Sequence, residues 1–241
     1  MAGRLAILGG CGGIGRQLVA DAQAVGWDTV VFDLPLSIEA HPVPGVDMHA
    51  IDASDADDLL RAASKLDSPL RGFVNLCGFV TENRPVLENQ PDDWHEVMNG
   101  NLGAAFHAMR AFVPRIAPGG SVVQIGSGLG HFARPGYGPY AIAKAGIAAL
   151  TRQMAIELAP DIRVNTVAPS AVDTAFLRGG TGRSDESAKP RLDLDTYAAG
   201  IPMRRVAVPA DITGPILFLL SAQAAYVTGQ VLHVNGGAFM P

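Results

Sequence analysis

Short apolar runs recur along this chain, and several are continuous rather than alternating with polar residues. Continuous Val, Ile and Leu runs are typical of parallel strands that are covered on both faces. The pattern predicts seven strands, at Leu5–Gly9, Thr29–Phe32, Met48–Ile51, Gly72–Leu76, Ser121–Ile125, Arg163–Val167 and Val231–Val234.

Longer helical patterns separate these runs. They predict helices at Ile14–Val25, Asp55–Ser64, Asp92–Phe112, Tyr140–Leu158 and Ala210–Leu220. Alternating strands and helices joined by short turns favour an α/β fold with a doubly wound parallel sheet and helices on both faces. Because no repeat, low-complexity tract or linker divides the chain, we expect one domain over residues 1–241.

Two segments interrupt this rhythm. Prolines at positions 35, 42 and 44 leave little room for a crossover helix between Asp33 and Asp52, so we expect a loop there with at most one turn of helix. Residues of about 176–200 are rich in charge and glycine and lack a clear period. A connection of that length is either disordered or functional, and we predict a lid over a substrate site.

Composition argues against several classes of protein. Hydrophobic residues make up 48% of the 241 residues, too many for a disordered chain. No apolar run approaches the ~20 residues that span a bilayer, and the N-terminus lacks the pattern of a secretory signal. The net charge of −5, without a dense Lys/Arg cluster, argues against nucleic acid or a membrane as partner. Two cysteines fit a reducing compartment, so we expect a cytoplasmic protein, and the scattered histidines predict no metal site.

The first predicted strand ends in glycines, and a helix opens directly after them. In such a turn the missing side chains of Gly9, Gly13 and Gly15 let backbone amides and a helix N-terminus approach a pyrophosphate. Asp33 follows Gly15 by 18 residues, at the end of the next strand. A carboxylate there accepts the ribose hydroxyls of NAD and repels the 2′-phosphate of NADP. The loop alone leaves two alternatives open, a plain tight turn and an S-adenosylmethionine site.

A second motif lies on the helix that begins at Tyr140. Tyr140 and Lys144 are four residues apart and therefore share one face of that helix. A phenol titrates near ~10, and a neighbouring ammonium ion lowers that pKa. Ser127, 13 residues before the tyrosine at a strand end, can donate a hydrogen bond to a substrate carbonyl. Taken alone, the pair is equally compatible with a solvated helix face.

These motifs occur in the order and spacing of the short-chain dehydrogenase/reductase family, which the chain resembles over nearly its whole length. The resemblance rests on the glycine loop, Asp33, Asn75–Gly78, Asn101, Ser127, Tyr140, Lys144, Pro169–Thr174 and the closing TGQVLHVNGG at 228–237. It implies a Rossmann-type fold and hydride transfer between a nicotinamide and an alcohol/carbonyl pair.

The resemblance also implies roles for single residues. Tyr140 would be the general acid–base, Ser127 would orient the carbonyl oxygen, and Lys144 would lower the tyrosine pKa and hold the nicotinamide ribose. Asn101 would kink its helix and hold a water of a proton relay. The implied cofactor-binding residues are Gly9, Gly13, Ile14, Gly15, Asp33, Asp52, Ala53, Asn75, Cys77, Gly78, Tyr140, Lys144, Pro169, Val172 and Thr174. Of these, Asp52 would bind adenine, and a helix N-cap is its alternative interpretation.

Some positions depart from the family pattern. Leu8 stands where the family usually has Thr and Leu76 where it has a second Asn, so we hypothesise that apolar packing of the two leucines replaces a polar contact. Cys11 and Cys77 are expected on adjacent loops near the cofactor. Two small buried residues are the simpler interpretation of these cysteines, and a redox switch is the other.

The sequence therefore predicts an NAD-dependent oxidoreductase that interconverts a secondary alcohol and a ketone. A 3-oxoacyl-thioester reductase of the same family is one alternative, although such enzymes usually carry basic residues near the ribose. A non-catalytic NAD-sensing protein is another. The substrate is a small molecule that the sequence does not name. The family pairs its long helices across a dimer axis, so we expect a homotetramer or homodimer.

Overall fold

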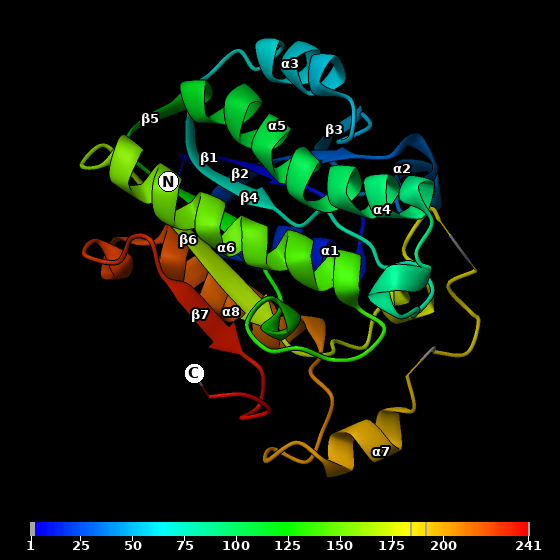
Figure 1. Cartoon of the computed structure of the whole chain (residues 1–241). Helices are drawn as coiled ribbons and strands as arrows, with labels where there is room; N and C mark the ends of the chain where they lie inside the picture. The colour runs from blue at the N-terminus through cyan, green and yellow to red at the C-terminus, as the bar shows by residue number, and fades with distance from the viewer. Residues whose placement is uncertain (1–2, 184, 191, 241) are drawn as a thin grey trace.

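Seven parallel strands form one sheet in residues 3–183, 185–190 and 192–240, the part of the chain that the computed structural model describes. The strand order is β3-β2-β1-β4-β5-β6-β7 (Figure 1). Their bounds are β1 (Gly3–Leu8), β2 (Trp27–Asp33), β3 (Asp47–Ala50), β4 (Leu70–Asn75), β5 (Ile116–Ile125), β6 (Ile162–Pro169) and β7 (Val231–Val234). The order reverses between β1 and β4, as in a doubly wound Rossmann-type sheet. The predicted fold class is confirmed.

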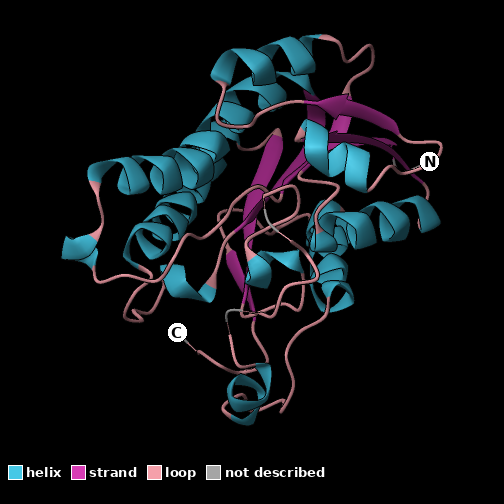
Figure 2. Ribbon diagram, turned by 90° about the vertical axis from the view of Figure 1, so that its right-hand side faces the viewer, coloured by secondary structure: helices cyan, strands magenta, loops and turns pink. Residues whose placement is uncertain are grey.

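Helices cover both faces of this sheet (Figure 2). They are α1 (Gly13–Ala24), α2 (Pro35–Ala40), α3 (Ala56–Ser64), α4 (Pro91–Met98), α5 (Ala104–Phe112), α6 (Gly138–Leu158), α7 (Leu194–Ala199) and α8 (Pro209–Leu220). One core cluster joins α1 and α8 to the sheet through Leu18 and Ile216. The other joins α3 and α5 through Leu59 and Phe112, whose ring lies 4.7 Å from that of Phe73.

Local signals explain how two of these helices begin. The side chain of Asp55 accepts hydrogen bonds from the backbone N–H groups of Asp57 and Asp58 and so caps α3. The alternative interpretation of Asp52 as this N-cap is therefore wrong. Pro35 occupies the first turn of α2, where its missing N–H costs nothing. At six residues this helix is longer than the single turn expected at most between Asp33 and Asp52.

The predicted helix Asp92–Phe112 is not uniform. Between α4 and α5 the backbone passes through a π-helical turn, Asn99–Gly103. The side-chain amide of Asn101 donates hydrogen bonds to the carbonyls of Val97, at 2.9 Å, and Phe79, at 3.0 Å. A side chain that enters the hydrogen-bond ladder in this way is a recognised cause of a local helix distortion.

Within the described residues no helix is both long and apolar enough to cross a membrane. The chain after β6 forms the short 3₁₀ helix η5 (Ala175–Arg178), then a loop, then α7. Figure 1 shows α7 apart from the layers of the sheet, below the loop that leads into α6. The segment predicted as a lid thus contains a helix, α7, that the sequence analysis did not predict.

Candidate active site

A cavity of about 700 Å³ opens at the carboxyl ends of the strands. Most of the predicted site residues line it: Gly9, Gly13, Ile14, Gly15, Asp33, Asp52, Ala53, Cys77, Gly78, Ser127, Tyr140, Lys144, Pro169, Val172 and Thr174. Asn75 and Asn101 are buried behind the cavity wall, each 1% exposed. The structure therefore brings together side chains from segments that are up to about 160 residues apart in the chain, as the ends of parallel strands do.

The glycine loop leaves backbone amides open to this cavity. Gly9 has a φ of +83°, which side-chain-bearing residues rarely adopt. A Cβ on Gly13 would lie 2.6 Å from the Thr174 side chain, so the glycine allows that threonine to close the other side of the loop. No side chain caps the N-terminus of α1. Its free N–H groups and helix dipole suit an anionic group such as a pyrophosphate.

Asp33 is fixed at the end of β2 by two backbone donors. The N–H of Cys11 lies 2.8 Å from one carboxylate oxygen, and the N–H of Leu34 lies 2.8 Å from the other. The side chains of Ser37 and Cys11 also interact with this carboxylate, which can accept up to about four hydrogen bonds, a ribose hydroxyl among them. Burial raises the pKa of Asp33, and these hydrogen bonds oppose that shift. Asp52 is exposed, and its Oδ1 accepts hydrogen bonds from the N–H and hydroxyl of Ser54.

Asn75 is buried behind the cavity wall and is hydrogen-bonded to two residues around it. Its amide donates to the side-chain oxygen of Gln124 at 2.8 Å, and its own oxygen accepts the N–H of Cys77 at 3.0 Å. The second bond holds the backbone at Cys77, which does line the cavity. The side chain of Asn75 thus shapes the cofactor loop from outside the cavity.

Ser127, Tyr140 and Lys144 lie at one end of the cavity. Tyr140 is 8% exposed and Lys144 is 2% exposed. The Lys144 ammonium donates to the carbonyl of Ile125 at 3.1 Å and lies 5.5 Å from the centre of the tyrosine ring. Ser127 follows β5, its hydroxyl accepts the N–H of Leu129 at 3.2 Å, and its interaction with Tyr140 acts to lower the pKa of the phenol. The predicted catalytic side chains therefore meet inside the fold, and the solvated-face alternative for Tyr140 and Lys144 is wrong.

The pKa values differ from the simple expectation of a lowered tyrosine. Burial raises the pKa of Tyr140 to about 12, and the hydrogen bond with Ser127 only partly opposes that shift. Burial also lowers the pKa of Lys144 to about 8. In the protein alone, loss of solvation outweighs any help that the ammonium gives to the phenolate. The lowering of the tyrosine pKa by Lys144 therefore stays a prediction.

Asn101 places an unused acceptor beside Lys144. The Oδ1 atom of Asn101 is buried and has no hydrogen-bond partner among the described residues. A Cβ on Gly78 would lie 2.5 Å from this oxygen and 2.9 Å from the Lys144 nitrogen, so both polar groups flank the same glycine. A buried acceptor of this kind needs a donor. A water or the lysine itself can supply one.

The departures from the family pattern have apolar surroundings. Leu8 is fully buried beside the carboxyl end of β4, in the core cluster with Phe32 and Phe73. Leu76 packs against the other cluster, which lies on the opposite face of the sheet. Each leucine is therefore in an apolar environment. However, the two side chains lie on opposite faces of the sheet, as side chains of consecutive positions do, so they do not pack against one another in place of the family's polar contact.

Cys11 and Cys77 are free thiols. Burial raises the pKa of Cys11 to about 12 and raises that of Cys77 as well. The thiolate is the reactive form of cysteine, so both environments disfavour thiol exchange. Cys11 belongs to the core cluster around Ile7 and Leu18, whereas Cys77 packs against the other cluster. These positions favour the interpretation as small packing residues.

The sequence analysis missed part of the cavity beyond Tyr140. Leu129, Phe132, Tyr137 and Phe176, the first residue of the predicted lid, line this part of the cavity. Asn83, Arg134 and Asn235, which the sequence did not mark, line it as well, and so does Tyr197 from the predicted lid. No local motif marks these residues, since they come from loops and from α7, which only the tertiary fold brings to the site.

Part of the predicted lid crosses the cavity mouth. We call residues Thr181–Arg183 and Asp185–Glu186 the strap. Arg183 pairs with Glu96 of α4 at 2.7 Å, and its guanidinium lies 3.7 Å from the centre of the Phe79 ring. On the other side, Glu186 contacts His41 just after α2 at 3.0 Å. The strap therefore joins the two sides of the cleft.

The described residues contain no group of three or more His, Cys, Asp or Glu side chains placed to hold a metal ion. The predicted site residues offer backbone amides, carboxylates, the Ser127 hydroxyl, the Tyr140 phenol and the Lys144 ammonium ion. This set fits a dinucleotide, which offers phosphates to amides and ribose hydroxyls to a carboxylate.

Comparisons with known proteins agree with this arrangement. The family described as Enoyl-(Acyl carrier protein) reductase matches residues 10–238. The 3-oxoacyl-[acyl-carrier-protein] reductase of Thermotoga maritima is 31% identical over 244 residues, which cover 96% of this chain and 95% of that protein.

Solved structures are similar over the same extent. A short-chain dehydrogenase/reductase from Brucella melitensis, described as glucose/ribitol dehydrogenase, has a TM-score of 0.87 at 27% identity and covers 100% of this chain and 98% of its own. A 3-oxoacyl-[acyl-carrier protein] reductase with bound NAD from the same organism has a TM-score of 0.83 at 27% identity and covers 99% and 91%. The chain is thus an oxidoreductase that belongs to the short-chain dehydrogenase/reductase family.

Proposed function

We propose that this protein is an NAD-dependent oxidoreductase that interconverts a secondary alcohol and a ketone. The observation that carries the proposal is one cavity with two differently equipped ends. Asp33 and the glycine loop lie at one end, and Ser127, Tyr140 and Lys144 lie at the other. An extended dinucleotide bound at the first end would bring its nicotinamide to the second.

The proton in this reaction is assigned to Tyr140. A bound nicotinamide supplies hydride transfer to or from the carbinol carbon. For reduction, the Tyr140 hydroxyl donates its proton to the carbonyl oxygen, while the Ser127 hydroxyl donates a hydrogen bond that orients that oxygen. For oxidation, the phenolate accepts the alcohol proton. Removal of water from this apolar pocket strengthens both hydrogen bonds.

Lys144 and Asn101 are proposed to serve Tyr140 indirectly. The ammonium of Lys144 stabilises the phenolate and can bind the hydroxyls of the nicotinamide ribose. The unpartnered Oδ1 of Asn101 supports a place for a water beside that ammonium. Such a water would pass protons between the lysine and solvent. The positive charge of an oxidised nicotinamide would lower the tyrosine pKa further, which the buried phenol requires.

The preference for NAD over NADP rests on Asp33. Its carboxylate is held by two backbone donors, and no Lys, Arg or His of the described residues is ion-paired with it. Arg16 is the first cation after the glycines, and its guanidinium donates to the carbonyl of Cys11 at 2.7 Å. A 2′-phosphate at this position would meet a carboxylate without a compensating cation. The similar reductase from Brucella melitensis was solved with NAD.

Binding of NADH and NADPH by the purified protein is the first test, followed by turnover of a panel of secondary alcohols and ketones. We expect NADH to bind at least 10-fold more tightly, because the carboxylate repels the extra phosphate and accepts two ribose hydroxyls. Asp33→Ser should remove that preference. Tyr140→Phe should lower kcat by at least 100-fold with little change in NADH affinity. Tighter binding of NADPH or full turnover by Tyr140→Phe would contradict the proposal.

Reduction of 3-oxoacyl thioesters is the second candidate function. It is favoured by the relative from Thermotoga maritima, which bears that name and matches 96% of this chain. The same tyrosine chemistry would serve it. A 3-oxoacyl thioester and a simple ketone of equal chain length, compared by kcat/KM, separate the two candidates.

We also propose that the segment of about 176–200 acts as a lid of the single domain 1–241. The contacts of the strap with α4 and with His41 support this role. Assembly as a homotetramer is supported by exposed apolar side chains on two separate surfaces, α5 with α6 and α8 with β7. A location in the cytoplasm stays a prediction.

A further inference from the structure

The charged side chains around the cavity are unevenly paired. Those of the described residues that line it are Asp33, Asp52, Glu96, Arg134, Lys144 and Arg183. The two aspartates lie after β2 and β3, at the end assigned to adenosine, and Lys144 belongs to the catalytic group. Glu96 and Arg183 neutralise one another in a 2.7 Å ion pair. Among these charged residues, Arg134 has neither an ion-pair partner nor a role in the proposed reaction.

Arg134 lies six residues before Tyr140, in the loop between the 3₁₀ helix η4 (Gly128–Gly130) and α6. Its guanidinium lies 5.7 Å from the centre of the Tyr197 ring on α7. Tyr197 is itself held, because its hydroxyl accepts the N–H of Ala171 at 3.4 Å. In the described part of the chain, the guanidinium of Arg134 makes no hydrogen bond and no ion pair. Its N–H donors are therefore available, while the contact with the ring helps to fix its place.

The pocket between Arg134 and Tyr140 is apolar. Leu129, Tyr137 and Phe176 pack in one cluster with Tyr140, and the Phe176 ring lies 5.9 Å from the tyrosine ring. Phe132 lines the cavity beside them. Arg134 itself is exposed at the edge of this pocket, and a substrate that fills the pocket would cover part of it, which would reduce the screening of a charge pair formed there. An anionic group on a substrate would find Arg134 as its partner, and an apolar substrate body would fill the space before it.

We propose that Arg134 determines specificity by binding a carboxylate of the substrate, and that the substrates are hydroxy acids and the matching oxo acids. The planar guanidinium suits the two oxygens of a carboxylate. The reacting carbon would lie at Ser127 and Tyr140, separated from the carboxylate by an apolar chain. This inference rests on the proposed function, since it assigns the substrate class of the same site.

Arg178 and Arg183, the arginines of the lid within the described residues, do not compete for this role. Arg178 pairs with Asp173 at 3.1 Å and also donates to the carbonyls of Thr174 and Ala188. Arg183 is paired with Glu96. Their charges are used within the protein, so a substrate carboxylate would have to break an existing ion pair to reach them.

Matched ketones test the proposal. The probes are methyl-ketone acids of the levulinate series, with two, three or four methylene groups between ketone and carboxylate, and their methyl esters. Binding to the enzyme–NADH complex is measured by calorimetry, and reduction is measured as kcat/KM. We expect at least one acid to exceed its ester by about 10- to 100-fold, the range of a hydrogen-bonded charge pair. Arg134→Gln should bring that acid down to its ester and leave the ester unchanged, and Arg134→Lys should restore part of the preference.

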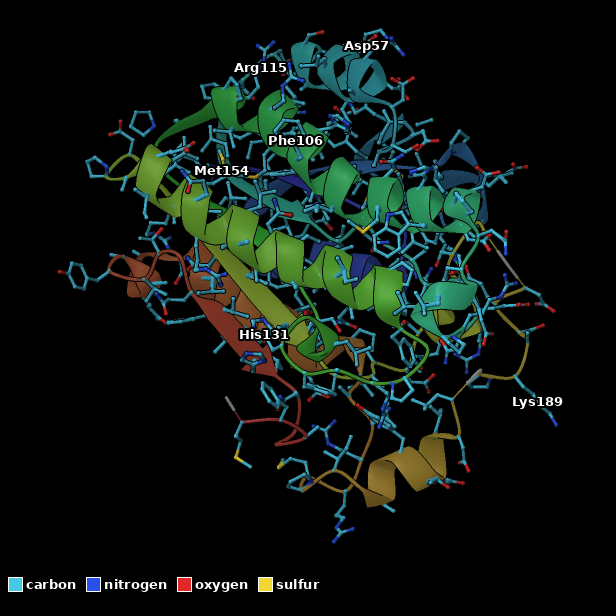
Figure 3. The ribbon with its side chains drawn as sticks, in the orientation of Figure 1. Asp57, Phe106, Arg115, His131, Met154 and Lys189 are labelled. Atoms are coloured by element: carbon cyan, nitrogen blue, oxygen red, sulfur yellow. The ribbon has the colours of Figure 1, made fainter. Side chains whose placement is uncertain are left out.

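Arg115→Gln is the control variant. Arg115 is exposed and lies at the opposite end of the molecule (Figure 3), so its loss should not alter the preference. Equal use of acids and esters by the unchanged protein would overturn the proposal. So would an equal loss of both in Arg134→Gln, which would indicate a structural role, or a failure of every acid to bind the NADH complex. Calorimetry measures binding without turnover. If only the proposed reaction were wrong, the acids would therefore still bind through Arg134 but would not be reduced.

Discussion

Lys144 is a cation whose surroundings favour its neutral form. The side chain is 2% exposed, and burial lowers its pKa from 10.5 to about 8. One hydrogen bond, to the carbonyl of Ile125, compensates part of the lost hydration. The buried charge of Lys144 therefore lowers the free energy of unfolding, as is common for residues that are retained for function rather than for packing.

The variant Lys144→Met should therefore be more stable than the natural protein at neutral pH. The lysine is charged both in the folded and in the unfolded chain below pH 8, so the full cost applies there. It amounts to at most about 3 kcal/mol for a pKa shift of this size. The gain should shrink between pH 8 and 10.5, where the folded lysine is neutral and the unfolded one is still charged, and vanish above that range.

Urea unfolding of both proteins at several pH values measures this difference, with turnover recorded alongside. We expect the variant to be inactive and stabilised at pH 7. A variant that is less stable at pH 7, or a gain that grows with pH, would show that Lys144 stabilises the fold through its contacts. Met fills a volume similar to that of the lysine stem, so a cavity does not complicate the comparison.

Single residues also show what the sequence could and could not predict. Ser127, Tyr140 and Lys144 were found because fixed spacing and motif order mark them. Arg134 was not, since it is an ordinary residue until the fold sets the loop before α6 against Tyr197 of α7. Local spacing likewise reveals the ammonium ion but not the burial of the phenol, which raises the pKa of Tyr140 in the protein alone.

At the scale of elements, the hydrophobic pattern located every strand of the sheet but not the irregularities that shape the site. The π-helical turn Asn99–Gly103 depends on a hydrogen bond from Asn101 to Phe79, a residue 22 positions away. Helix α7 has only six residues, too few for a period to emerge. The π-helical turn is set by a tertiary contact that the pattern does not contain, whereas α7 begins at a local N-cap, Asp193, on a helix too short for the pattern to reveal.

The strap is the element whose contacts bear most directly on cofactor exchange. If it closes over bound cofactor, the variants His41→Ala and Glu186→Gln should each release NADH faster. The pair is 3.0 Å long and partly buried, so a loss of up to about 1 kcal/mol, or roughly 5-fold in the dissociation rate, is expected. Stopped-flow fluorescence of NADH release measures the rate.

Arg61→Gln serves as the matched control for the strap, because Arg61 pairs with Asp58 on α3, outside the cavity lining. Its NADH release should equal that of the natural protein. The double variant of His41 and Glu186 should be no faster than either single variant, since both remove one contact. Unchanged release in both single variants would mean that the strap does not hold the cofactor.

At the scale of the whole molecule, apolar side chains remain exposed on two separate surfaces. Phe106 on α5 and Ile156 on α6 form part of one, where these helices lie side by side (Figure 1). Phe218 on α8 and Leu232 on β7 form part of the other. Two different self-complementary contacts generate a tetramer with three two-fold axes. The protein should therefore have the mass of four 25.1 kDa chains in solution.

Light scattering of charged variants tests both surfaces at once. Phe106→Glu and Phe218→Glu should each leave a dimer, because an unpaired carboxylate buried in an apolar contact costs several kcal/mol, about enough to break it. The double variant should be a monomer with an unchanged circular dichroism spectrum. Leu87→Glu is the control: Leu87 is 97% exposed on the 3₁₀ helix η1 (Val86–Glu88), outside both surfaces, and its variant should stay a tetramer. A natural protein that is already monomeric, or single variants that keep the full mass, would show that these apolar side chains do not join copies of the chain.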